Sequence, residues 1–157
     1  MGDPKVGKWS QRGHVYIWNY KEEKKNFPGF HITADKDEGE SLSKLLNLMK
    51  NAKWPSFADL KISQPSLDIL RVPNALGGHA KILSLDSLRI KYPKGDVQPD
   101  HWSLTNSMRS GLLVLGKNKI SQLEKGIHDV LASKGDYAIG PDSDEQREML
   151  LWFWWRL

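Results

Sequence analysis

Gly111, Gly116 and Lys117 have the spacing of a phosphate-binding loop. In such a loop the backbone N–H groups of a glycine-rich turn surround the phosphates, and the lysine reaches the terminal one. The residue after Lys117 is Asn118, where the motif has Ser or Thr. The four residues between the glycines are Leu-Leu-Val-Leu, which are typical of a strand and not of a flexible loop. The sequence therefore does not favour nucleotide binding at this position.

Histidine and serine chemistry receives little support from residue spacing. The chain has five histidines, and none has the spacing of zinc or iron ligands: His14, His31, His79, His101 and His128. His31 lies four residues before Asp35 and His101 directly follows Asp100, so either is a candidate general base oriented by a carboxylate. A structural role is the alternative, which we favour for both.

Hydrolase chemistry is not supported by a motif, although the chain has many serines. No Gly-x-Ser-x-Gly motif is present. The absence of cysteine excludes disulfides, thiolate metal sites and a cysteine nucleophile. We therefore predict no catalytic residue, no metal site and no cofactor.

Seven tryptophans are present, and three of them crowd the C-terminal end of the chain. In an extended strand Trp152 and Trp154 would share one face, and Phe153 and Trp155 the other. One interpretation is a central strand with helices packed on it. The other is a contact surface for a partner protein, because tryptophan is enriched where binding energy concentrates.

Two acidic clusters, at 35–40 and 142–148, contrast with a mildly basic chain that has 23 Lys+Arg against 19 Asp+Glu and a net charge of +4. The first precedes a predicted helix, whose N-terminus favours carboxylates. Neither has the ligand order of a calcium loop. Beyond capping or solvated roles, such clusters would attract a basic partner protein. The predicted partner-binding residues are Asp35, Asp37, Glu38, Asp142, Asp144, Glu145, Trp152 and Trp154.

Basic and aromatic residues occur together in two other segments: Lys5, Lys8, Trp9, Arg12, Lys21, Lys24 and Lys25, and then Arg89, Lys91, Tyr92 and Lys94. A surface of this kind would neutralise and stack on a nucleic acid. Acidic residues are interleaved at Glu22, Glu23 and Asp96, and no RNA-recognition or helix-turn-helix motif is present. Nucleic-acid binding is therefore the alternative prediction.

Hydrophobic periodicity predicts the strands that must position these residues. Alternation predicts strands over 14–20, 30–33, 60–63, 67–72 and 80–92, the last with a bend near 86, and hairpins that join 101–105 to 111–115 and 136–139 to 150–155. We expect Leu112–Leu115 to be buried on both faces, because all four residues are apolar.

Two helices are predicted from apolar residues at helical spacing. The first covers 38–52, with Asp37 and Glu40 as its capping pair. The second runs through 120–131, with Ser121 and Glu124 as its capping pair, and Gly135 follows as a C-cap.

The length of 157 residues is enough for a core without disulfides, and 39% hydrophobic with 27% charged residues is typical of a folded domain. We predict an α+β domain over 14–157, with a mainly antiparallel sheet and two amphipathic helices packed on it, after a loose lead-in over 1–13. No apolar run approaches eighteen residues, and the first ten residues contain no apolar core of a signal peptide. The prediction is a cytoplasmic protein with no membrane contact.

Several short motifs resemble a loosely defined group of small bacterial proteins of unknown function. They are Gly135-Asp-Tyr-Ala-Ile-Gly140, Leu151-Trp-Phe-Trp-Trp155, Gly29-Phe-His-Ile-Thr33, Glu40-Ser-Leu42 and Asp100-His-Trp102. In size, fold class and lack of a catalytic motif, the chain is also similar to immunity proteins of contact-dependent and polymorphic toxin systems. That resemblance implies a non-enzymatic antidote whose partner is a cognate toxin. A hydrolase built on His31 or His101 is the third hypothesis.

Overall fold

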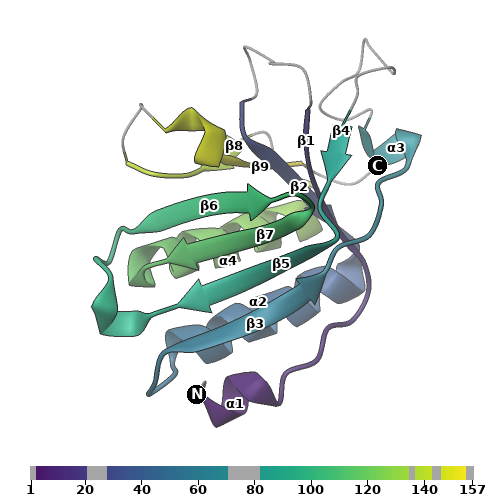
Figure 1. Cartoon of the computed structure of the whole chain (residues 1–157). Helices are drawn as coiled ribbons and strands as arrows, with labels where there is room; N and C mark the ends of the chain where they lie inside the picture. Colours follow the sequence, from purple (N-terminus) through teal and green to yellow (C-terminus); the bar gives the residue numbers. More distant parts are fainter. Residues whose placement is uncertain (1–2, 21–27, 71–81, 135–136, 143–145, 155–157) are drawn as a thin grey trace.

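The structure is a computed structural model that describes residues 3–20, 28–70, 82–134, 137–142 and 146–154. These residues form nine strands in two mostly antiparallel sheets, together with four α-helices (Figure 1). The predicted α+β class is confirmed. None of the helices in these ranges is long and apolar enough to cross a membrane.

The five-stranded sheet has the order β4-β1-β2-β9-β8. Its strands are β4 (Ile82–Ser84), β1 (Val15–Tyr20), β2 (Phe30–Ala34), β9 (Leu151–Phe153) and β8 (Tyr137–Ile139). Neighbouring strands are antiparallel except β2 and β9, which are parallel. The predicted strands at 14–20 and 30–33 and the C-terminal hairpin are confirmed, and β9 lies inside the sheet, not at its edge.

The four-stranded sheet has the order β3-β5-β7-β6. Its strands are β3 (Ser56–Lys61), β5 (Ser87–Tyr92), β7 (Ser110–Leu115) and β6 (Trp102–Ser107). β5 and β7 are parallel, and the other neighbours are antiparallel. The predicted hairpin of β6 and β7 is confirmed. The predicted bend near Asp86 is also confirmed, because the chain there leaves β4 in one sheet and enters β5 in the other.

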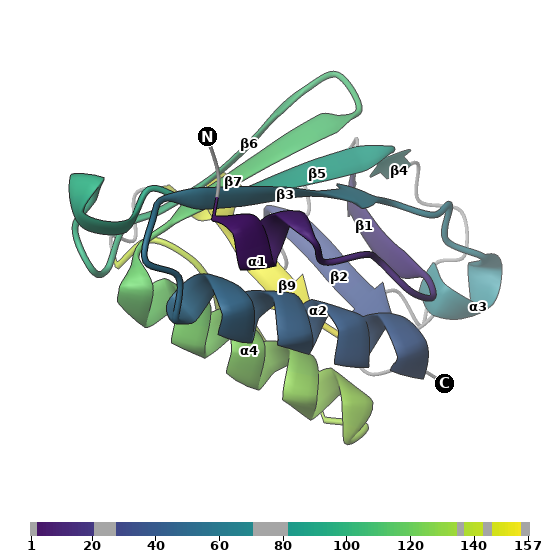
Figure 2. The ribbon, with the colours of Figure 1, turned by 90° about the horizontal axis from the view of Figure 1, so that it is seen from below.

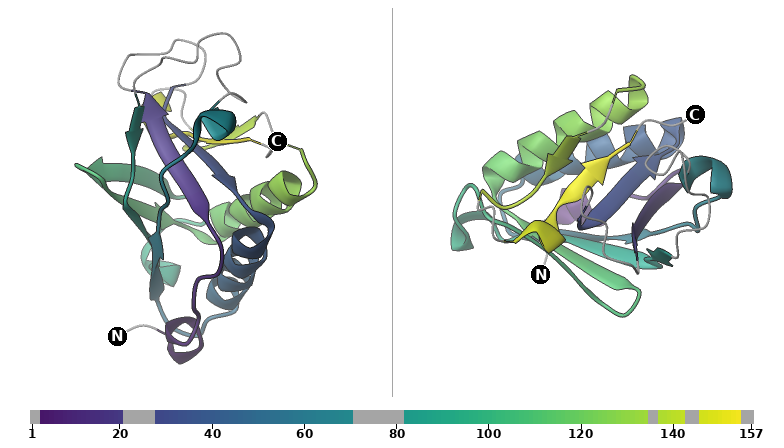
Figure 3. Two further views of the ribbon diagram at one scale, coloured as in Figure 1. Left: turned by 90° about the vertical axis from the view of Figure 1, so that its right-hand side faces the viewer. Right: turned by 90° about the horizontal axis from the view of Figure 1, so that it is seen from above.

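Helices α2 (Lys36–Lys50) and α4 (Lys117–Leu131) pack against each other on one side of the four-stranded sheet (Figure 2). The shorter helices are α1 (Pro4–Gly7) and α3 (Leu67–Leu70), and the 3-10 turns are η1 (Lys94–Asp96) and η2 (Arg147–Met149). The five-stranded sheet closes the remaining side of the core, so the two sheets and the helix pair surround it in cross-section (Figure 3).

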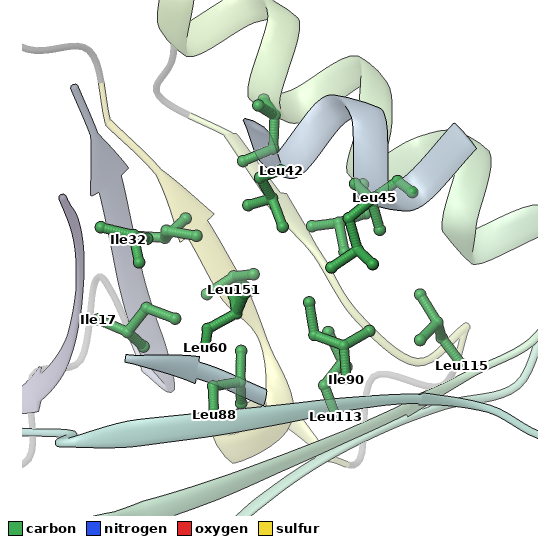
Figure 4. Close-up of a cluster of buried hydrophobic side chains, with 14 of the residues drawn as sticks. Ile17, Ile32, Leu42, Leu45, Leu60, Leu88, Ile90, Leu113, Leu115 and Leu151 are labelled. Atoms are coloured by element: carbon green, nitrogen blue, oxygen red, sulfur yellow. The ribbon is translucent and has the colours of Figure 1, made fainter. Parts of the chain in front are cut away.

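The main core fills the space between these three layers. Figure 4 shows Ile17 and Leu151 from the five-stranded sheet, Ile90 and Leu113 from the four-stranded sheet, and Leu45 from α2 pointing toward one another. A second cluster lies apart from this core and contains Tyr16, Trp18, Ile69 and Trp154. Strand alternation explains it, because Tyr16 and Trp18 point to the face of β1 opposite Val15 and Ile17.

The first helix begins two residues and the second three residues earlier than predicted, so both predicted capping pairs are wrong. The cap of α2 is Asp35, whose Oδ1 accepts the Glu38 backbone N–H at 2.9 Å, and Asp37 lies inside the first turn. Helix α4 begins after Gly116, which has no side chain to act as a cap. The apolar periodicity that located the helices begins only after their polar first turns.

Three other predictions need correction. The strand at 67–72 is wrong, because 67–70 is the helix α3 and 71–72 lie outside the described residues. Strand β3 begins at Ser56, four residues before its predicted start. The strand β7 is not buried on both faces: Leu112 is 38% exposed and Val114 is half-buried, because the helices cover only one face of this sheet. The predicted C-cap Gly135 lies outside the described residues.

The N-terminal segment is packed against the domain. Within the predicted lead-in, α1 contacts β3 and α2, and Val6 belongs to the main core at 3% exposed. Trp9 Nε1 donates to the Ser41 carbonyl at 2.8 Å. These contacts attach residues 3–9 to the start of α2 and the edge strand β3.

Replacing Gly126 by alanine should destabilise the fold. An added Cβ would lie 2.7 Å from Cε1 and Cζ of Phe153, whose side chain is fully buried on β9. The resulting overpacking, roughly 1–3 kcal/mol, should outweigh the gain in helix propensity of about 1 kcal/mol. Gly95→Ala is the control, since nothing lies within 4 Å of its added Cβ. Thermal unfolding should show a lower Tm for Gly126→Ala only; equal Tm values would contradict this packing.

Candidate functional site

The outer face of the four-stranded sheet is uncovered. In β3 and β5 buried and outward-facing residues alternate, and the buried ones face α2 and α4. No described helix or strand lies over the opposite face, which is turned toward the viewer in Figure 1. We name this surface the open face. It consists of Phe57, Asp59, Lys61, Ser87, Arg89, Lys91, Ser103, Thr105, Ser107, Ser110, Leu112 and Val114.

The strand register arranges the open face in three rows that run from β3 to β6. The rows are Lys61-Ser87-Ser110-Ser107, Asp59-Arg89-Leu112-Thr105 and Phe57-Lys91-Val114-Ser103. Charged and aromatic residues therefore lie on β3 and β5, whereas apolar and hydroxyl residues lie on β7 and β6. Arg89 and Leu112 are neighbours in the middle row.

Arg89 is held in place on the open face by two neighbours. Its Nε and Nη2 donate to the two carboxylate oxygens of Asp59 at 2.8 and 3.0 Å. Its guanidinium carbon lies 4.5 Å from the centroid of the Phe57 ring. These two hydrogen bonds lower the pKa of Asp59 and raise the pKa of Arg89. Both side chains are about half exposed, at 50% and 57%, and such pairs add little to stability. The pair instead orients a cation toward solvent.

The open face combines positive charge with exposed apolar area. Lys61, Arg89 and Lys91 against Asp59 give three positive charges and one negative, a net charge of +2. Phe57 is 43% exposed on the same face. Arginine and aromatic residues beside apolar ones are the composition of protein contact surfaces.

Three of the four described acidic residues that were predicted to bind a partner have internal roles. Asp35 accepts the backbone N–H groups of Glu38 and His14, both at 2.9 Å. Glu38 itself is fully buried. Asp142 accepts a hydrogen bond at 2.8 Å from the buried Lys119 and keeps 69% of its side chain exposed. Asp37 is exposed, and Asp144 and Glu145 lie outside the described residues.

The two predicted tryptophans share one face of β9, opposite Phe153, as the alternation indicated. Trp154 is 3% exposed, and its Nε1 donates to His31 Nδ1 at 2.8 Å. Trp152 is half-buried, and its Nε1 donates to the Pro28 carbonyl at 2.9 Å. Trp154 is therefore an interior residue of the fold, and of the two only Trp152 reaches the surface.

The two candidate general bases lie in different settings. His31 is fully buried and stacks on Trp18 and Trp154, with ring centroids 5.6 and 6.0 Å apart. Because Nδ1 of His31 accepts a hydrogen bond from Trp154, the proton of the neutral ring lies on Nε2. Asp100, the neighbour of His101, accepts a hydrogen bond from Asn118 Nδ2 at 2.8 Å. Among the described residues, no three potential metal ligands gather.

The basic and aromatic residues predicted for nucleic-acid binding do not form one surface. Arg89 and Lys91 lie on the open face, but Tyr92 points inward and is 4% exposed. Lys5 lies in α1 and Trp9 follows it by two residues, and 21–25 fall outside the described residues.

Sequence reasoning missed Phe57 and Asp59, the two residues that position Arg89. The signal was present, because the segment Ser56–Lys61 alternates and places Ala58 and Leu60 inward. The expected start of the strand at Leu60 left both residues outside it.

Comparisons with protein-family models, curated proteins and solved structures give no match to this chain. The resemblance to immunity proteins therefore stays a prediction.

The buried carboxyl group of Glu38 should make the stability of the fold depend on pH. Burial is the main cause that raises the pKa of Glu38 from 4.5 to about 7. An interaction with Gln11 lowers this pKa, and the Asp35 carboxylate raises it. The folded state thus holds this proton more tightly than the unfolded state, so stability is lost as pH rises from 4.5 to about 7. A rise from 4.5 to about 7 corresponds to about 3 kcal/mol.

Glu38→Gln should remove this contribution. Chemical denaturation at about pH 5 and pH 8 should show a smaller loss of unfolding free energy for Glu38→Gln than for the natural chain. Glu40→Gln, at an exposed position of the same helix, should keep the loss. Parallel pH profiles for all three proteins would contradict the assignment to Glu38.

Proposed function

We propose that the chain is a non-enzymatic binding protein of the antidote type, which docks a toxin-like partner protein on the open face. The observation that carries the proposal is Arg89, fixed by Asp59 and Phe57 beside the exposed Leu112. A pre-positioned arginine loses little freedom on binding, and arginine and aromatic anchors supply much of the binding energy of protein interfaces.

The charge of the open face selects the kind of partner. A net charge of +2, from Lys61, Arg89 and Lys91 against Asp59, favours a partner whose contact surface is acidic around an apolar centre. Two copies of this face would repel each other, which disfavours a homodimer through it. The proposal therefore replaces the basic partner expected from the acidic clusters by an acidic one.

A second candidate function is binding of single-stranded nucleic acid on the same face. The observation in its favour is that Phe57 offers a ring for base stacking beside Lys91 and Arg89. Phosphate contacts make such binding fall steeply with salt, whereas an interface centred on packed anchors loses much less.

Leu112→Glu should strongly weaken partner binding if the proposal is right. It places a carboxylate next to Arg89 in the centre of the open face, and loss of one anchor contact weakens binding by about 30-fold or more. Leu67→Glu is the matched control, because Leu67 is also an exposed leucine, at 66%, but lies on α3.

Both variants and the natural chain would be used for capture from extracts of the source cells, with nuclease treatment and a high-salt wash. We expect one stoichiometric protein on the natural chain and on Leu67→Glu, and none on Leu112→Glu. The purified partner should then lose its own activity when mixed with the natural chain in a one-to-one ratio. Equal retention by Leu112→Glu would contradict docking at the open face, and retention of nucleic acid alone would favour the second candidate.

A further inference from the structure

A hollow of about 940 Å³ lies at one end of the four-stranded sheet, between the β5–β6 connection and the first residue of α4. Its lining includes Tyr92, Lys94, Asp96, Pro99, His101 and Lys117. The parallel strands β5 and β7 both end here, at the left of Figure 1 where their arrowheads point. Crevices beyond the carboxyl ends of parallel strands are common ligand sites, and the volume is within the range of small-molecule pockets.

Backbone hydrogen bonds join the β5–β6 connection to the start of α4, the two segments that border the hollow. Gly116 N–H donates to the His101 carbonyl at 2.8 Å, and Asn118 N–H donates to the Pro99 carbonyl at 2.9 Å. A side chain at position 116 would collide with the carbonyl oxygens of Gln98 and Pro99, so glycine permits this approach. On the other side, Lys94 has a φ of +60°, a left-handed conformation that is unusual for lysine. The site is therefore formed before any ligand arrives.

Three nitrogen-bearing side chains of the hollow have no anionic partner among the residues that the structure describes. Lys94 Nζ donates to a neutral group, the Lys53 carbonyl, at 2.6 Å. The side chains of His101 and Lys117 make no hydrogen bond or ion pair with the described residues. The lysines Lys94 and Lys117 against Asp96 give two positive charges and one negative in the lining, a net charge of +1. A net charge of +1 favours a ligand with one anionic group over a nucleic-acid strand with many phosphates.

We propose that the hollow binds a small phosphate monoester with an apolar body. Lys94, His101 and Lys117 come from three separate segments of the lining, and their N–H groups are donors of the kind that phosphate oxygens accept. Val97 and Pro99 supply apolar contacts for the body of the ligand. This site is separate from the open face and does not depend on the proposed antidote function.

The test is an NMR titration of the full chain with phenyl phosphate. We expect saturable shifts of the amide signals around His101 and Lys117, and weaker binding of inorganic phosphate and of benzoate. Lys117→Gln should weaken phenyl phosphate binding by about tenfold, since it removes a charge-assisted hydrogen bond. Lys44→Gln, at an exposed position on α2, should leave the affinity unchanged.

His101→Ala is a second variant that should also weaken binding, and unchanged melting temperatures would show that both variants fold. Equal affinity of Lys117→Gln and the natural chain would overturn the proposal. It would also be overturned by shifts that map away from the hollow, by an equal effect of Lys44→Gln, or by benzoate binding as tightly as phenyl phosphate.

Discussion

Burial of one side of the four-stranded sheet against α2 and α4 decides which side chains the other side presents. Successive residues of a strand point to opposite faces, so burying Leu88 and Ile90 at 3% and 1% exposed places Arg89 outward. The same constraint in the neighbouring strands places Asp59 and Leu112 beside it. A register shift of one residue in any of these strands would move its core side chains to the surface and its surface side chains to the core. The packing of the core therefore also fixes which residues form the candidate site.

In the five-stranded sheet, the alternation of side chains along each strand has a different result. This sheet buries residues on both faces, because the aromatic cluster around Trp18 and Trp154 lies on the side away from the main core. The hydrogen bond from Trp154 to His31 satisfies a buried indole N–H there. The tryptophan-rich C-terminus consequently serves the fold through Trp154, while the contact surface that we propose lies on the sheet with one uncovered face.

Electrostatic roles divide in a similar manner. Asp35 caps α2, Glu38 is enclosed, and Asp142 neutralises the buried Lys119, so these carboxylates serve folding more than attraction of a partner. The basic excess of the chain remains available on Lys61 and Lys91 of the open face and on Lys117 of the hollow. The open face and the hollow belong to the same sheet, and both depend on the parallel pairing of β5 with β7. This pairing places the outward-facing residues of the two strands side by side and brings the C-terminal ends of the two strands together.

The sequence by itself determined the class of the fold, the two long helices and most strands, because each depends on a local apolar period that neighbouring residues carry. It also identified Arg89 and Lys91 as surface candidates. Only the tertiary structure decided that Asp59, thirty residues away, faces Arg89, and that Trp154 is interior. Register between distant strands and the covering of a face arise from long-range packing, and no local period encodes which segments meet.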